Sequence, residues 1–244
     1  MQVTAAALAD NNRGGAAIAV AVSIRPYVSA GTRLVDDVQL EASALDPAGA
    51  VKASAQEAFH IEGRGGRFER LLLMNLKPGR YQLRIAMQSK TAVKAGSVFT
   101  DIDVPDFSKA PLTLSGIILH AEPGLVVGPA DRLAAVVPVV PTTLRDFFRG
   151  QKVTAFLRVY QGGRAAVVPV HLRAQILDGR NMKVYDADET LSTDGFKANR
   201  AADSRLELPI DQLAPGPYLF TLQATDPTAT VTRDVRFQIM GAGK

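Results

Sequence analysis

Apolar and polar residues alternate with a period of two along most of this chain, which is the spacing of β-strands. In the stretch 17–24 the larger apolar side chains share one face, and they are Ile18, Val20, Val22 and Ile24. Small residues occupy the other face, as in a strand with one packed face. No segment sustains the i, i+3, i+4, i+7 spacing of an amphipathic helix. The pattern therefore predicts an all-β protein.

The alternating runs form one set of predicted strands in each half of the chain. In the first half these strands are 2–9, 17–25, 37–46, 51–61, 67–75, 80–88 and 96–104. In the second half they are 112–121, 153–161, 166–177, 182–192, 203–210, 217–225 and 230–239. Short strands separated by turn residues at close intervals are typical of an antiparallel β-sandwich.

One phrase occurs twice and relates the two halves. The sequence "NLKPGRYQLRI" at 75–85 returns as "QLAPGPYLFTL" at 212–222. The stretches 38–57 and 170–189 also align once a single residue is gapped, and the alternation keeps its parity in both copies. Because a one-residue slip would turn the apolar residues to solvent, shared parity indicates shared packing. A period of about 130 residues is too long for a solenoid repeat and fits two copies of one domain.

Tyr81 and Tyr218 hold the same position in the two copies, directly after a Pro-Gly pair and at the start of an alternating run. Proline fixes φ before the turn, and glycine supplies a positive φ where the turn needs it. We predict that each tyrosine buries its ring while its hydroxyl reaches the backbone. The tyrosine corner of immunoglobulin-like sandwiches has this arrangement.

The fold expected from these patterns is all-β, with two tandem immunoglobulin-like or fibronectin III-like antiparallel β-sandwiches. The connection lies in "PDFSKAPLTLSG", where two prolines within seven residues disfavour a continuous strand. We expect a first sandwich at 1–105, a linker at 106–111, a second sandwich at 112–240 and a flexible tail at 241–244.

The composition fits ordinary globular domains and excludes some chemistry. Of the 244 residues 47% are apolar and 21% are charged, which suits one large domain or two ordinary ones. The absence of cysteine excludes disulfides, thiolate catalysis and cysteine-based zinc sites. The net charge is +4, but the basic residues are scattered singly and do not cluster as a nucleic-acid-binding surface requires. We therefore expect no nucleic-acid partner.

The apolar stretches do not predict a membrane segment. The first 15 residues lack the basic start and apolar core of a signal peptide. The longest apolar stretch, "LAAVVPVVP" at 133–141, is too short to span a bilayer and contains two prolines. We therefore expect no membrane insertion.

Three stretches together resemble a known bacterial family. They are "GSVFTDIDVPDFSKAPLTLSGIIL" (96–119), "VTAFLRVYQGG" (153–163) and "RLELPIDQLAPGPYLFTLQAT" (205–225). They are similar to the C-terminal region of von Willebrand factor type A-related proteins of the acidobacterial type. The resemblance covers residues 16 to 240, and its more specific pieces are "VPDFSKAPLTLSG" and "AFLRVYQGG".

This resemblance implies an accessory role and a location. Such proteins usually begin with a signal peptide and a von Willebrand type A domain, so the resemblance implies export to the periplasm, the cell surface or the medium. The present chain would then correspond to the accessory region of two β-sandwiches. The Asp-x-Ser-x-Ser metal motif of the type A domain is absent from this sequence, so no metal-binding residue can be transferred.

The three histidines do not form a recognisable site. His60, His120 and His171 lie far apart in sequence and lack the spacing of metal ligands. His171 falls on the strand face opposite Val170 and Leu172, so we expect it to point outward. Because a catalytic base must lie within reach of a nucleophile, these residues do not predict an enzyme. No catalytic residue, metal or cofactor is expected.

Two short stretches admit a ligand-binding interpretation beside a structural one. In "YDADETLSTDG" (185–195), Asp186 and Asp188 could ligate calcium, although the EF-hand pattern is not met; the alternative is a charged strand edge that blocks edge-to-edge pairing. In "GRGGRFER" (63–70), the glycines suggest a phosphate loop or an RNA-binding Arg-Gly segment. A strand pattern follows where a phosphate loop needs a helix, which favours a hairpin loop.

The stretch "TTLRDFFRGQ" (142–151) contains two adjacent phenylalanines among arginines. Phe147 and Phe148 cannot both face one core from a strand, although a short helical turn could bury both. We expect them at an interface between the domains, with a partner-binding anchor as the alternative. Phe156 and Tyr160 lie opposite the apolar face of their strand and could extend either surface.

The sequence favours a non-catalytic structural or protein-interaction module whose protein partner it does not identify. The alternatives are a carbohydrate-binding module and a two-domain periplasmic chaperone that offers a strand edge to its client. Sugar-binding sandwiches usually present a row of exposed aromatics, whereas aromatic residues make up 6% of this chain and tryptophan is absent. Burial of the adjacent phenylalanines between the domains would favour a scaffold, and their exposure a binding protein.

Overall fold

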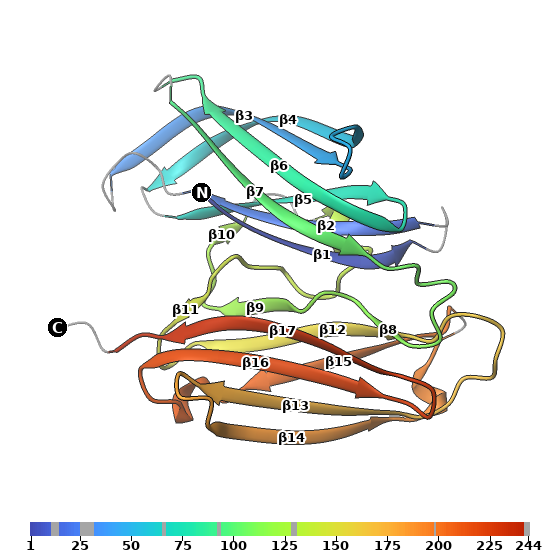
Figure 1. Cartoon of the computed structure of the whole chain (residues 1–244). Coiled ribbons are helices and arrows are strands. Elements are labelled where there is room, and N and C mark those ends of the chain that lie inside the picture. The colour runs from blue at the N-terminus through green and yellow to red at the C-terminus, as the bar shows by residue number, and fades with distance from the viewer. Residues whose placement is uncertain are drawn as a thin grey trace. The chain divides into compact units, whose positions relative to one another are not determined.

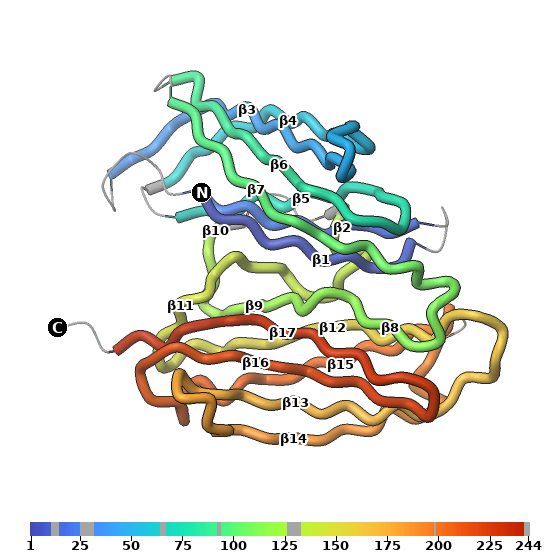
Figure 2. The backbone as a smooth tube through the Cα atoms, viewed as in Figure 1, coloured from blue at the N-terminus to red at the C-terminus, as the bar shows by residue number. Residues whose placement is uncertain are grey.

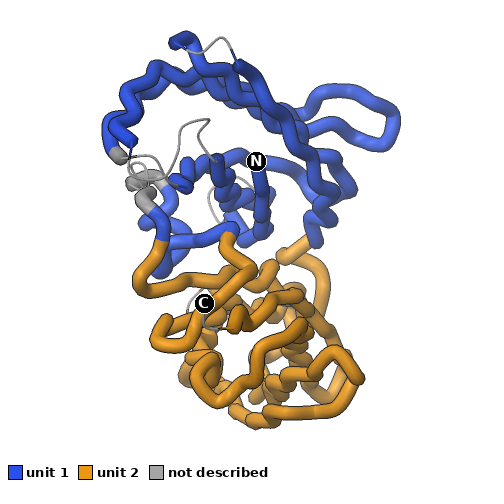
Figure 3. Tube along the Cα trace, turned by 90° about the vertical axis from the view of Figure 1, so that its left-hand side faces the viewer, with its two compact units in different colours: residues 1–105, 125–143 blue, residues 106–124, 144–244 orange. Residues whose placement is uncertain are grey.

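The chain folds into two compact units (Figures 1 and 3). The structure is a computed structural model, and it describes residues 1–10, 15–24, 32–64, 67–91, 94–127, 131–197 and 199–241. Unit 1 comprises residues 1–105 and 125–143, and unit 2 comprises residues 106–124 and 144–244. This division differs from the expected boundaries. Residues 106–111 belong to unit 2 and are not a separate linker, and residues 125–143 belong to unit 1 and not to the second sandwich.

Unit 1 contains two four-stranded sheets, whose strands are labelled in Figure 1. One sheet has the order β1-β2-β5-β10, and the other has the order β4-β3-β6-β7. The strands are β1 (Gln2–Asp10), β2 (Gly15–Ile24), β3 (Arg33–Leu45), β4 (Val51–Arg64), β5 (Phe68–Leu76), β6 (Gly79–Ser89), β7 (Ala95–Val104) and β10 (Val126–Val127). All pairs are antiparallel except the short pairing of β10 with β5.

Unit 2 is built in the same way, as the backbone trace in Figure 2 shows. One sheet has the order β15-β12-β8 with β9 also on β12, and the other has the order β11-β17-β16-β13-β14. The strands are β8 (Thr113–Leu114), β9 (Ile118–Glu122), β11 (Asp146–Phe147), β12 (Lys152–Tyr160), β13 (Val170–Asp178), β14 (Lys183–Leu191), β15 (Ala201–Leu208), β16 (Gly216–Thr225) and β17 (Thr230–Ile239).

The helical elements are short, namely α1 (Asp131–Ala134), η1 (Thr193–Gly195) and η2 (Ile210–Gln212). In the part of the chain that the structure describes, no helix is long and apolar enough to cross a membrane.

The two units share one strand topology, which confirms the expected fold class. In unit 1 the first, second and fifth strands form one sheet, and the fourth, third, sixth and seventh strands form the other. Unit 2 repeats this arrangement with β8 and β9 in place of the first strand, followed by β12 to β17. Each unit is therefore a fibronectin III-like sandwich, and the repeated sequence encodes a repeated fold.

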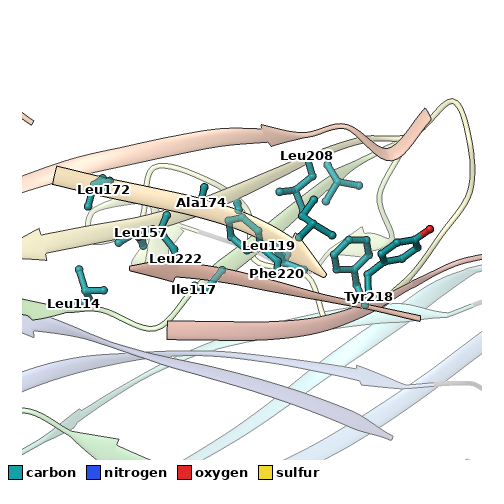
Figure 4. Close-up of a cluster of buried hydrophobic side chains, with 14 of the residues drawn as sticks. Leu114, Ile117, Leu119, Leu157, Leu172, Ala174, Leu208, Tyr218, Phe220 and Leu222 are labelled. Carbon is teal, nitrogen blue, oxygen red and sulfur yellow. The ribbon is translucent and has the colours of Figure 1, made fainter. Parts of the chain in front are cut away.

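Each sandwich packs the alternating apolar side chains of its strands into one core. In unit 2 the core includes Leu157, Leu172, Phe220 and Leu222, each at most 2% exposed (Figure 4). These side chains come from both sheets, so their burial joins the two layers. At roughly 25 cal/mol per Å² of buried apolar surface, this interdigitated layer supplies the main favourable free energy of folding.

The repeated Pro-Gly-x-Tyr phrase forms a tyrosine corner in each unit. The Tyr81 hydroxyl donates a hydrogen bond to the Lys77 carbonyl at 3.0 Å, and the Tyr218 hydroxyl donates one to the Ala214 carbonyl at 2.7 Å. Both rings are buried, and both acceptors lie four residues upstream. The preceding glycines have φ values of 152° and 151°, which glycine adopts more readily than other residues. Burial raises the pKa of the Tyr218 hydroxyl above its ordinary value.

We expect Tyr81→Phe and Tyr218→Phe each to lower the free energy of unfolding of its own unit by about 1 kcal/mol. The ring stays in the core in both variants, and only the corner hydrogen bond is lost. Urea denaturation, monitored by hydrogen exchange in peptides of each unit, measures the change in stability. Tyr185→Phe is the control, because Tyr185 is a partly buried tyrosine outside the corner. Corner variants as stable as the wild type would show that these hydroxyls contribute nothing.

Residues 106–110 belong to unit 2 because they pack on a glycine pair after β12. The Gly162 amide donates to the Ala110 carbonyl at 2.9 Å, and the Gly163 amide donates to the Ser108 carbonyl at 2.7 Å. A Cβ atom at position 162 would lie 2.5 Å from the Ala110 oxygen, so only glycine fits. The ring of Phe107 lies 4.5 Å from that of Tyr160. The sequence did not predict these partners, since they lie about fifty residues apart along the chain.

Residues 125–143, here called the strap, belong to unit 1 because β5 binds them at two points. The strand β10 pairs in parallel with the start of β5. Glu69 of β5 is 1% exposed, and its Oε1 accepts hydrogen bonds from the Thr142 hydroxyl at 3.1 Å, the Thr143 hydroxyl at 2.7 Å and the Thr143 amide. A buried carboxylate thus fixes the end of the strap.

Candidate functional site

The adjacent phenylalanines separate into one core residue and one surface residue. Asp146–Phe147 forms β11, which pairs in parallel with β17, so the side-chain alternation of a strand applies to them. Phe147 is 0% exposed in the core of unit 2, with its ring 6.1 Å from that of Phe237. Phe148 is 49% exposed. Phe147 is therefore a core residue of unit 2, whereas the sequence analysis expected it at an interface between the domains or in a partner-binding anchor. No helical turn buries both side chains.

Phe156 and Tyr160 lie on the face of β12 that points away from the core of unit 2, as the alternation predicts, but both are buried. Phe107 covers Tyr160. Between them on β12, Arg158 forms an ion pair with Asp203. Burial works to lower the pKa of Arg158, but the hydrogen bond and charge of Asp203 raise it overall. Neither aromatic is an exposed anchor.

Each histidine pairs with one carboxylate at the surface. The pairs are His60 with Asp37, His120 with Glu122 and His171 with Asp188, at 2.9, 3.1 and 3.3 Å. The His171 side chain is exposed, as expected. Within the described residues, no three His, Asp or Glu side chains come together as a metal site would require. The structure does not bring these histidines to one place.

Cationic side chains surround the acidic residues of β14. Asp186 accepts hydrogen bonds from Arg173 at 2.8 and 3.0 Å, from Gln175 at 3.2 Å and from Lys183. The hydrogen bonds of Arg173 and then Lys183 lower the pKa of Asp186 well below its ordinary value. Asp188 pairs with a histidine on the neighbouring strand. These contacts favour the charged strand edge over a calcium site, since a cation would have to displace them.

The glycine-rich stretch 63–70 connects two different sheets. β4 ends at Arg64 and β5 begins at Phe68, and these strands belong to opposite layers of unit 1. The expected hairpin is therefore wrong, because a hairpin joins neighbouring strands of one sheet. Residues 65–66 lie outside the described part of the chain.

The outer face of the sheet β4-β3-β6-β7 presents an exposed aromatic side chain. Phe99 on β7 is 68% exposed and lies opposite Arg84 on β6. The Arg84 Nε donates to the Gln82 amide oxygen at 2.7 Å, and the Gln82 amide nitrogen donates to Asp101 at 3.4 Å. These four residues, here called the Phe99 surface, combine one apolar ring with a network of three polar side chains.

The sequence carried a signal for this surface that we did not use. Along β7, Val98, Ile102 and Val104 share the inward parity, whereas Phe99 falls on the polar face with Asp101. A large aromatic on the polar face of a strand is exposed by its parity. Aromatic and arginine side chains are the types enriched where proteins bind one another.

The architecture places the chain in the class of tandem fibronectin III-like β-sandwich proteins. No family model and no curated protein matches its sequence.

Comparison with solved structures gives distant matches. A glycosyl hydrolase family 2 member from Bacteroides cellulosilyticus matches 91% of this chain at 13% identity and a TM-score of 0.36. Dimeric latent PorU from Porphyromonas gingivalis matches 98% at 11% identity and a TM-score of 0.34. A putative β-galactosidase from Bacteroides fragilis matches 92% at 13% identity and a TM-score of 0.33. The present chain covers 26%, 20% and 32% of those chains, and these distant likenesses assign it no substrate.

Proposed function

We propose that this chain is a non-catalytic protein-interaction module and that unit 1 binds a protein partner through the Phe99 surface. The exposure of Phe99 beside Arg84 carries the proposal. Burying a phenylalanine that is exposed in the free protein contributes about 1.5–3 kcal/mol to association. Arginine adds a planar donor group that pairs well with partner carboxylates. The sheet supplies a rigid support, so little conformational entropy is lost on binding.

A protein partner fits this surface better than a carbohydrate does. Sugar-binding sandwiches stack several sugar rings on several aromatic side chains. In the described residues each unit exposes one large aromatic side chain, Phe99 in unit 1 and Phe148 in unit 2. A single aromatic ring with an arginine beside it suits a protein hot spot.

We further propose that the chain is the accessory part of an exported von Willebrand type A-related protein. The support is the resemblance of "VPDFSKAPLTLSG" and "AFLRVYQGG" to that family. These two stretches contact each other through Gly162, Gly163 and Phe107. Their contact makes them one structural element of unit 2.

A photo-crosslinking experiment in the source cells tests the interaction. A benzophenone amino acid at position 99 should crosslink a defined protein, and the same group at position 148 is the matched control because Phe148 is also exposed. Purified partner should bind Phe99→Ala at least about tenfold more weakly than wild type, which corresponds to 1.4 kcal/mol. Equal crosslinking from both positions, or unchanged affinity of Phe99→Ala, would rule out the Phe99 surface.

A further inference from the structure

Unit 1 holds a carboxylate at a position where its fold needs an apolar residue. Asp36 lies on β3 between Leu34 and Val38, with the parity of the core-facing side chains, and it is 4% exposed. Aspartate is almost never fully buried unless it is paired, because moving its charge out of water is costly. Asp36 therefore requires an explanation beyond packing.

The described residues provide little compensation for this charge. The Thr91 amide donates to Asp36 Oδ1 at 3.3 Å, which is a long hydrogen bond. Among the described residues, no cationic side chain forms an ion pair with Asp36. The neighbouring Asp37 points to the opposite face and pairs with His60 at 2.9 Å. The two adjacent carboxylates thus have different surroundings.

Asp36 lines a cavity between the two sheets of unit 1. The cavity has a volume of about 260 Å³, and its apolar lining includes Ile24, Leu34, Val38, Phe68 and Met87. Ser89 and Lys94 complete its polar lining, and Lys94 is exposed. A concave apolar site with few polar groups is the usual form of a small-molecule site.

The second copy of the domain has no carboxylate at the aligned position. Extending the alignment of 38–57 with 170–189 by two residues places Val168 opposite Asp36. In unit 2 the Gln161 side chain binds the Val168 amide at 3.0 Å and the Val168 carbonyl at 2.6 Å. The backbone just before β13 is therefore held by an amide side chain, whereas the aligned position in β3 carries a charged side chain beside a cavity.

We propose that this cavity binds a small apolar molecule that carries an ammonium group, with Asp36 as its counter-ion. The volume suits one aromatic ring with a short chain, since a cavity of roughly 150 Å³ already holds benzene. The largely apolar lining lowers the local dielectric constant, which strengthens the attraction between Asp36 and the bound cation. This site lies inside the sandwich and is separate from the Phe99 surface on the outer face of the sheet.

Ligand titration of the full chain tests the proposal. With methionine methyl groups labelled with carbon-13, phenethylamine should shift the Met87 signal in a saturable manner. Its neutral analogue 2-phenylethanol should bind at least about tenfold more weakly, because it lacks the charge that Asp36 recognises. Asp36→Asn should weaken phenethylamine binding by a similar factor. Asp37→Asn, which removes an equal charge from the opposite face, should leave binding unchanged.

The comparison of the two ligands on the wild-type protein keeps the test valid if Asp36→Asn does not fold. No shift of the Met87 signal by phenethylamine at millimolar concentration would overturn the proposal. Equal affinities for phenethylamine and 2-phenylethanol would overturn it as well, as would wild-type affinity in a folded Asp36→Asn. Failure here leaves the crosslinking result at position 99 unaffected, so the two proposals are tested separately.

Discussion

Replacing Phe147 by alanine should lower the free energy of unfolding of unit 2 by about 3–5 kcal/mol. Phe147 is 0% exposed, and its ring lies between β11 and the core side chains near Phe237. Removing it loses the free energy of burying the ring and leaves a cavity that the surrounding strands cannot fully close. Urea denaturation, monitored by hydrogen exchange in peptides of unit 2, measures the change in the free energy of unfolding.

Phe148→Ala is the matched control for this prediction. It removes the same side chain from the next residue, but Phe148 is 49% exposed. We expect a change within about 0.5 kcal/mol, as for most surface substitutions. Equal destabilisation by both variants would contradict the strand alternation of β11 and favour a turn that buries both rings.

The second large effect concerns Glu69. Glu69→Ala should destabilise unit 1 by about 3 kcal/mol, because it leaves the buried donors of Thr142 and Thr143 without their shared acceptor. Glu69→Gln keeps one acceptor oxygen and should cost about 1 kcal/mol. Hydrogen exchange of the Thr143 amide reports the effect locally, and its protection should fall most in Glu69→Ala.

Glu62→Ala provides the control for Glu69. Glu62 pairs with Arg33 at the surface, and its side chain is 61% exposed. Surface ion pairs contribute 0–1 kcal/mol, so we expect a change within about 0.5 kcal/mol. If Glu69→Ala proves as mild as Glu62→Ala, the carboxylate does not hold the strap.

The main strands could be predicted because each is long enough to show alternation. The expected strands 153–161 and 230–239 correspond to β12 (Lys152–Tyr160) and β17 (Thr230–Ile239). The strands β10 and β11 could not be found in this way. Two residues have no period, and their partners in β5 and β17 lie far away in sequence. The placement of the strap and of Phe147 depends on these two pairings.

Two buried carboxylates lie at positions that strand alternation assigns to the packed face of their strands. Asp36 has the parity of Leu34 and Val38, and Glu69 has the parity of Leu71, so both could have been recognised as charges on packed faces. Their partners could not be derived in the same way. The acceptor role of Glu69 involves residues more than 70 positions along the chain, and no local pattern records such a contact.

The division of both units into two chain segments has a consequence for synthesis on the ribosome. Unit 1 is complete only when the strap has emerged, after the first part of unit 2 at 106–124 has already been made. At about 5–20 residues per second, translation of residues 106–143 takes several seconds. During this time the strand edge of β5 that later pairs with β10 has no partner. The carboxylate of Glu69 likewise lacks its hydrogen bonds from Thr142 and Thr143. The N-terminal sandwich therefore lacks its last segment during synthesis, although its main strands come first in the chain.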